Sequence, residues 1–259
     1  MFGNSPRRDG AESKNPFLRR IGRDVEESPS GMGPLDANLD GTYAQPMTTS
    51  GTVVKTAILT LLLLVTAGYA FVNPSPLFLW GGMIGGLVLA VVTAWKPQNA
   101  SWSAPAYALL EGLFVGAASA MYAYLEGGII LQAVSLTIGV LLTMLLLYQT
   151  GAIKVTARLR STVMAATGAI MLVYLVSIGL SFFGMSVPFL HDNSLLGIGI
   201  SLLIIGVAAF NLLLDFDNIE RGVAAQLPAR YEWVFSMGLL ITLVWLYIEI
   251  LRLLAISRD

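Results

Sequence analysis

The chain has 259 residues, of which 56% are hydrophobic and 12% charged, and its mean hydropathy is +0.73. A soluble domain carries roughly 25% charged residues, so this composition excludes an ordinary soluble domain and is typical of a polytopic membrane protein. The formal net charge is −1 and the sequence contains no cysteine. Disulfides, thiolate metal sites and thiol redox chemistry are therefore excluded.

Residues 1–50 differ in composition from the rest of the chain. They are rich in glycine, proline, serine, asparagine and charged residues, and such a segment buries too little apolar surface to offset the entropy of ordering. They also lack the apolar core of a cleaved signal peptide. We predict a disordered cytoplasmic tail over residues 1–50 and a transmembrane domain over residues 51–259.

Seven hydrophobic segments follow the tail, each near the length of about 20 apolar residues that crosses a bilayer. Glycine, proline and charged residues separate them. The expected helices cover about 52–72, 77–95, 104–125, 129–150, 162–183, 194–214 and 231–256. The predicted fold is therefore an all-α polytopic membrane protein, a seven-helix bundle whose surroundings are the lipid bilayer.

Small residues mark the second and third segments. The second contains the pair Gly85-Gly86, and in the third Gly112 and Gly116 follow Glu111 closely. Small residues let membrane helices approach one another at the backbone. We therefore expect close helix neighbours beside Glu111.

The positions of the basic residues predict the orientation. Of the 15 lysines and arginines, six lie in the tail and seven more fall in loops or helix ends on the tail's side of the membrane. The loops predicted on the other side contain none, so the amino terminus is predicted to be cytoplasmic in the cell membrane. Seven full crossings would place Arg252 near the outer side, which leaves open whether the seventh segment spans fully or is re-entrant.

Charged residues lie within or at the end of the apolar segments, where a charge costs several kcal/mol unless it faces protein or water. At 1.5 Å per residue, Lys55, Glu111 and Asp215 share one layer of the inner leaflet, with Asp215 at the end of its helix. Glu249 lies about 27 Å along the seventh helix, toward the outer leaflet.

Each charged residue also has a plainer interpretation. In this interpretation the Lys55 side chain extends to the membrane–water interface. Asp217, just beyond the sixth segment, is a solvated loop charge. Glu249 and Arg252, spaced at i and i+3, form an ordinary intrahelical pair in this interpretation. For Glu111 and Asp215 we favour a functional role.

The motifs that the chain lacks narrow the field further. It has no Walker A motif, dinucleotide-binding fingerprint, HExxH or GxSxG motif, and a single histidine, His191. We therefore expect no enzyme activity, no resident cofactor and no nucleic-acid partner. Carboxylates inside a helix bundle suit protons or hard cations, and Asp215 and Glu111 are the candidate Ca²⁺ ligands.

Three stretches carry a resemblance to a known family: Glu111-Gly112, Asp215-Phe216-Asp217, and the seventh-segment run over residues 245–254. Together with the layout of the spans, they make residues 50–259 resemble the Bax inhibitor-1 family, also called the YccA-like or transmembrane Bax inhibitor motif family, in its bacterial branch. The resemblance implies six helices around a hydrophobic central seventh. It also implies a pH-sensitive leak of Ca²⁺ across the membrane.

The same resemblance implies a gate of two aspartates, on the sixth and seventh helices, that share a proton and can engage a basic residue. Asp215 matches the first aspartate. If Arg252 is aligned with the arginine that often follows, the second aspartate falls on Thr242. Either Glu249 takes over that role, or Glu111 partners Asp215 instead; the depth estimates favour Glu111. Lys55, Asp217, Thr242 and Arg252 are the expected supporting residues.

Two hypotheses of different classes follow. The leading one is a pH-regulated cation leak channel, with Ca²⁺ as the permeant ion and proton-sharing carboxylates as the gate. Two close carboxylates do not both ionise readily, so they share a proton, and full ionisation would push the sixth and seventh helices apart. The alternative is a non-conducting interaction protein that modulates a membrane protease or a stress response through its tail and cytoplasmic loops.

Overall fold

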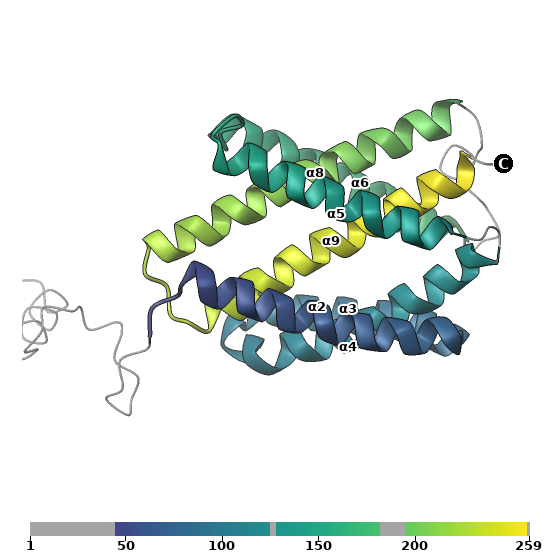
Figure 1. Cartoon of the computed structure of the whole chain (residues 1–259), viewed down its shortest axis with the longest axis horizontal. Helices are drawn as coiled ribbons and strands as arrows, with labels where there is room; N and C mark the ends of the chain where they lie inside the picture. Colours follow the sequence, from purple (N-terminus) through teal and green to yellow (C-terminus); the bar gives the residue numbers. More distant parts are fainter. Residues whose placement is uncertain (1–44, 125–127, 182–194, 258–259) are drawn as a thin grey trace, which may run out of the picture. The chain divides into compact units, whose positions relative to one another are not determined.

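The computed structural model describes residues 45–124, 128–181 and 195–257. The described residues from Pro46 onward form one compact unit. The helices are α2 (Thr49–Val72), α3 (Pro76–Trp95), α4 (Ala100–Ala123), α5 (Ile129–Gln149), α6 (Ala157–Ser181), α8 (Leu195–Ala224) and α9 (Tyr231–Ile256), with a short 3₁₀ turn, η1 (Pro97–Asn99), before α4 (Figure 1). All seven α-helices are long and apolar enough to cross a membrane, which confirms the predicted fold class. The predicted tail up to residue 44 and His191 lie outside the described residues.

Local sequence signals set the helix boundaries. The side chain of Thr48 accepts a hydrogen bond from Gly51 N at 2.9 Å and caps the start of α2. Ser75 caps α3 in the same way, with Pro76 at the first helical position, where its missing N–H costs nothing. Gly128 precedes α5 with a φ of 90°, a conformation that glycine adopts without steric cost.

The last helix, α9, is the centre of the bundle. Figure 1 shows it running obliquely between α2, α3 and α4 on one side and α5, α6 and α8 on the other. It packs against α2, α4, α5 and α8, while α3 packs behind α4 and α6 behind α8. The central seventh helix is therefore confirmed, but its close neighbours are four helices, and α3 and α6 form an outer layer.

Glycines allow the closest helix contact in the bundle, between α2 and α4. A Cβ placed on Gly116 would overlap the backbone carbonyl of Ala67, and one on Gly112 would overlap that of Leu63. These two positions therefore require glycine. The prediction of close helix neighbours beside Glu111 is confirmed, with α2 as the neighbour of Gly112 and Gly116.

The sixth membrane helix is longer than the sequence suggested. We expected it to end at Leu214, but α8 continues through Asp215 and Asp217 to Ala224. The continuation is stable because one face still packs: Ile219 is buried, and Gly222 lies against Phe235 of α9. Asp215 is therefore inside the helix rather than at its end.

The start of α2 and the turn between α8 and α9 meet at one end of the bundle. Met47 N donates to the carbonyl of Leu227 at 2.6 Å, and Pro46 forms a β-bridge with Pro228. Met47 itself is 2% exposed. This end also holds basic residues of α2 and α6, as the ion pairs below show, so residues that were predicted to share one side of the membrane do lie together.

Candidate functional site

Six acidic residues lie in the described part of the chain, and their partners divide them into two groups. Basic side chains hold three of them: Asp217, Glu232 and Glu249. Hydroxyl groups are the hydrogen-bonding neighbours of the other three: Glu111, Asp215 and Glu220. The charge of an ion-paired carboxylate is already compensated. A carboxylate bonded only to a hydroxyl can still take a proton or a cation.

Asp215 lies on α8 and faces the central helix. Oγ1 of Thr242 donates a hydrogen bond to Oδ2 of Asp215 at 2.6 Å. Because α8 continues to Ala224, Asp215 is about 14 Å inside that end of the helix. Among the described residues, no basic side chain pairs with it. Asp215 is thus an uncompensated carboxylate at the contact between α8 and α9.

Thr242 is the position at which the resemblance placed the second aspartate of the gate. The structure brings this residue into hydrogen-bonding contact with Asp215. The residue itself is a threonine, whose hydroxyl can donate or accept but does not ionise. Its Oγ1 also lies 3.3 Å from the carbonyl oxygen of Gly238 on α9, which is a second acceptor besides Asp215. The pair is therefore one carboxylate and one hydroxyl.

Glu111 lies at the interface of α3 and α4. A Cβ on Gly86 would be 2.5 Å from Oε2 of Glu111, so the glycine makes room for the carboxylate. Tyr107, one turn earlier on α4, is its hydrogen-bonding neighbour. Within the described residues no hydrogen bond joins Glu111 to Asp215. The depth estimate that favoured Glu111 as the partner of Asp215 therefore gains no support.

Lys55 forms an ion pair with Glu232, in the first turn of α9, and this contact replaces the interpretation of Lys55 as a free interfacial charge. Nζ of Lys55 also donates to the carbonyl of Ala229 at 3.3 Å. Glu232 accepts further hydrogen bonds from N of Thr48 at 2.8 Å and from Oγ1 of Thr48 at 3.1 Å. The cluster fastens the start of α2 to the start of α9.

Asp217 joins α8 to α6, so the interpretation of this residue as a solvated loop charge is wrong. Arg160 Nη2 lies 2.5 Å from its Oδ2, and Arg221 Nε lies 2.6 Å from the same atom. The Asp217 side chain is only 14% exposed. The continuation of α8 past Leu214 explains the difference. In the longer helix, Asp217 faces Arg160 of the neighbouring helix α6.

Glu249 forms the predicted intrahelical pair with Arg252, at 2.8 Å. Two further helices join this pair. The hydroxyl of Tyr174 on α6 donates to Glu249 and accepts from Nη1 of Arg252 at 3.0 Å, and Nη2 of Arg252 donates to Ser201 of α8 at 3.3 Å. Glu249 is thus engaged away from Asp215, and the described contacts do not give it the role of the second gate carboxylate.

The described residues contain no cluster of three or more acidic or histidine side chains arranged to hold a metal ion. Asp215 and Glu111, the candidate Ca²⁺ ligands, lie in different helix interfaces. Sequence reasoning missed Glu232, Tyr174 and Arg160 as partners. Each of them is far in sequence from the residue that it contacts. The sequence offered one indication of these contacts, the acidic residue Glu232 at the start of an apolar segment.

Comparison with protein families identifies one match that covers nearly the whole chain. The family described as Bax inhibitor 1 like matches residues 6–259. No curated protein matches the chain.

Proposed function

The chain belongs to the Bax inhibitor-1-like family, and we propose that it is a pH-regulated cation leak protein of the cell membrane. In this proposal Ca²⁺ is the permeant ion and Asp215 is the titrating group. The observation that carries the proposal is the uncompensated carboxylate of Asp215, hydrogen-bonded to Thr242 of the central helix at 2.6 Å. The proposed function is not enzymatic and requires no cofactor.

The Asp215–Thr242 contact accommodates both protonation states of the acid. When Asp215 is ionised, Thr242 donates to it, as the geometry at 2.6 Å allows. When Asp215 is protonated, it can donate to Oγ1 of Thr242, which then donates to the carbonyl of Gly238 at 3.3 Å. The helix contact survives both states, so repulsion between two carboxylates is not needed in this chain.

What changes with pH in this proposal is the charge that faces the contact. An ionised carboxylate deep in a membrane protein needs water or a cation close to it. Ionisation of Asp215 therefore favours entry of a cation between α8 and α9, and protonation removes that attraction. Thr242 can add a neutral oxygen ligand, a type that Ca²⁺ accepts. The expected leak rises as pH increases through the titration of Asp215.

The ion-paired carboxylates have a different part in this proposal. Asp217 fastens α6 to α8, Glu232 fastens α9 to α2, and the Glu249–Arg252 pair joins α6, α8 and α9. These contacts hold the helices around Asp215 in register while its charge changes. We also propose, from the positive-inside rule, that the end of the bundle with Lys55 and Arg160 faces the cytoplasm.

Calcium flux into proteoliposomes, measured with a fluorescent dye over a range of external pH, tests the proposal. The native chain should show a flux that depends on pH. Asp215→Asn keeps the shape and most of the hydrogen bonding but cannot ionise, so its flux should lose most of the pH dependence. Glu220→Gln is the matched control, because Glu220 also has a hydroxyl partner, Tyr148, but is exposed.

A second variant tests the Thr242 position. Thr242→Asp supplies a second carboxylate opposite Asp215, and two close carboxylates retain one proton between them. The curve of flux against pH should therefore move to higher pH. If Asp215→Asn keeps the native pH profile, Asp215 is not the titrating group. If the native chain carries no flux at any pH, the non-conducting interaction protein becomes the better hypothesis.

A further inference from the structure

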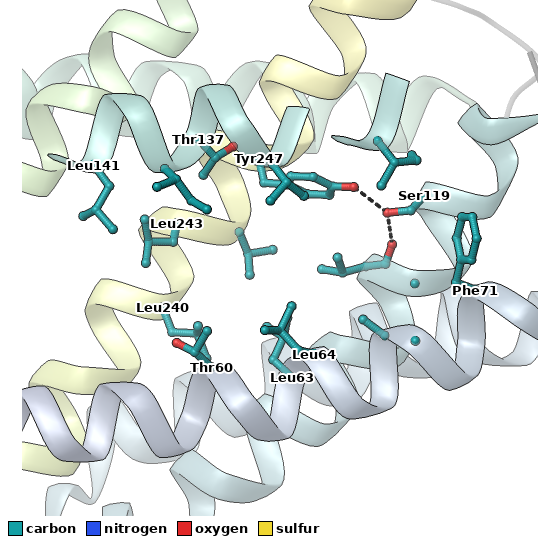
Figure 2. Close-up of a pocket in the computed structure, with 18 of the residues that line it drawn as sticks. Thr60, Leu63, Leu64, Phe71, Ser119, Thr137, Leu141, Leu240, Leu243 and Tyr247 are labelled. Carbon is teal, nitrogen blue, oxygen red and sulfur yellow. Dashed lines mark hydrogen bonds between the residues drawn. The ribbon is translucent and has the colours of Figure 1, made fainter. Parts of the chain in front are cut away.

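A cavity of about 530 Å³ lies beside the central helix, between α2 and α5. These two helices flank it, and α9 and α4 close its inner side (Figure 2). Its volume falls within the 300–1,000 Å³ that is usual for small-molecule sites. Protein interiors leave few voids larger than a water molecule, so a space of this size is unusual and large enough to hold a ligand. We refer to this space as the lateral groove.

The lining of the lateral groove excludes ions as that occupant. No charged side chain lines it. Its five hydroxyl groups are already hydrogen-bonded within the protein: Thr56, Thr60 and Thr137 donate to carbonyls of their own helices, and Ser119 and Tyr247 bond to each other at 2.7 Å. Ser119 also donates to the carbonyl of Val115. An occupant therefore meets a surface that is mostly hydrocarbon, on which the hydroxyl donors are already engaged.

The groove opens toward the bilayer. Leu64 on α2 and Ile138 on α5 both line it and remain 58% and 50% exposed, so they form its two rims on the membrane-facing surface. Its lining extends on α2 from Thr56 to Phe71, about 22 Å of helix axis. One leaflet of the hydrocarbon core is about 15 Å thick, so the groove is long enough for one chain of a bilayer lipid.

We propose that the lateral groove binds an acyl chain of a bilayer phospholipid, which reaches between α2 and α5 and packs directly on α9. The lining residues on α9 include Leu239, Leu243 and Val244. They flank Thr242 in sequence, while Thr242 itself turns toward α8. The central helix therefore has lipid on one face and the Asp215 contact on another. This proposal does not depend on ion conduction.

Photolabelling tests this proposal, because a helix at the centre of a bundle should otherwise be shielded from lipid. The full chain is reconstituted in phosphatidylcholine vesicles that contain a phospholipid with a diazirine in the middle of one acyl chain. After irradiation, labelled residues are identified by mass spectrometry. We expect labelling on α9 between Leu239 and Tyr247, in addition to the exposed faces of α2 and α5.

Gly68→Phe fills the groove. Gly68 lines it, and a Cβ there would meet nothing within 4 Å, so the larger side chain enters open space. Labelling of α9 should fall at least about fourfold, the equivalent of losing the burial of one CH₂ group. Leu87, an exposed residue of α3, serves as the internal standard for this labelling. The matched control is Gly139→Phe on α5, where a Cβ would also meet nothing within 4 Å but which does not line the groove. This control should leave α9 labelling unchanged.

Three outcomes would overturn the proposal. One is an unlabelled α9 in the native chain. Another is α9 labelling that persists in both Gly68→Phe and the smaller Gly68→Leu. The third is stronger labelling of α9 by a diazirine-bearing free fatty acid than by the phospholipid at the same mole fraction, which would assign the groove to a free fatty acid instead.

Discussion

The ion pair between Lys55 and Glu232 joins residues 177 positions apart, and its removal has a predictable effect on stability. Glu232→Gln keeps the size of the side chain and one acceptor for Thr48, but it removes the charge that Lys55 contacts. Breaking a fully buried pair costs about 3–5 kcal/mol. Lys55 is 20% exposed and retains the carbonyl of Ala229 at 3.3 Å. We therefore expect a smaller loss, about 2 kcal/mol, near the lower end for a hydrogen bond to a charged group.

This loss can be measured as a shift of the melting temperature in detergent, followed by tryptophan fluorescence. For a domain of this size, 1 kcal/mol changes Tm by about 2–4 °C, so Glu232→Gln should lower Tm by roughly 4–8 °C. Gly51→Ala should have a comparable effect, because a Cβ at Gly51 would overlap the carboxylate of Glu232. Gly139→Ala is its control, since a Cβ at Gly139 meets nothing within 4 Å.

A double-mutant cycle separates the ion pair from other effects of these substitutions. If Lys55 and Glu232 act together, the combination of Lys55→Met with Glu232→Gln should destabilise by less than the sum of the two single changes. Strict additivity would refute the reasoning. So would a Tm change below about 1 °C for Glu232→Gln, which is the behaviour of an ordinary surface substitution.

Three further outcomes are expected. Cysteine labelling in intact cells should reach a cysteine at Ser75 from outside and one at Ala225 only after permeabilisation; the reverse pattern would invert the proposed orientation. Deletion of residues 1–45 should leave Tm unchanged, because the contacts of Met47 with the turn after α8 begin beyond the deletion; a large drop would contradict this. Tyr174→Phe should lower stability by about 0.6 kcal/mol, the average for interhelical hydrogen bonds in membranes, and no more than about 1.7 kcal/mol, measured by the same melting assay.

The sequence predicted the fold well because composition and hydropathy decide it. Seven apolar segments separated by glycine, proline and charge leave little choice of architecture in a bilayer, where backbone groups must be satisfied within helices. Glycines at 112 and 116 correctly indicated close packing. The end of α8 was predicted wrongly, because the stretch Asp215-Phe216-Asp217 resembles a helix end when the packing of Ile219 is unknown.

The candidate site was predicted in part. The alignment through Arg252 singled out Thr242, and the structure places its hydroxyl in contact with Asp215. Counting residues along a helix gives the depth of a side chain in the membrane but not the direction in which it points. The count therefore placed Glu111 near Asp215, although Glu111 faces Gly86 on α3. The ion pair of Glu232 was missed for a similar reason. Contacts between distant segments depend on which helices are neighbours, and hydropathy carries no information about that.

The central position of α9 also bears on how the domain is made. The helices are synthesised in sequence order, and α9 emerges after α2, α4, α5 and α8, the helices against which it packs. Until then α2, α3 and α4 can pack together, but they have no partner for the faces that later contact α9. The link from Glu232 to Thr48 and Lys55 closes only at that point, and it joins α2 to α9. The core is therefore completed only after α9 has been made, and a nascent chain that stops short of α9 leaves the inner faces of α2, α4, α5 and α8 without their partner.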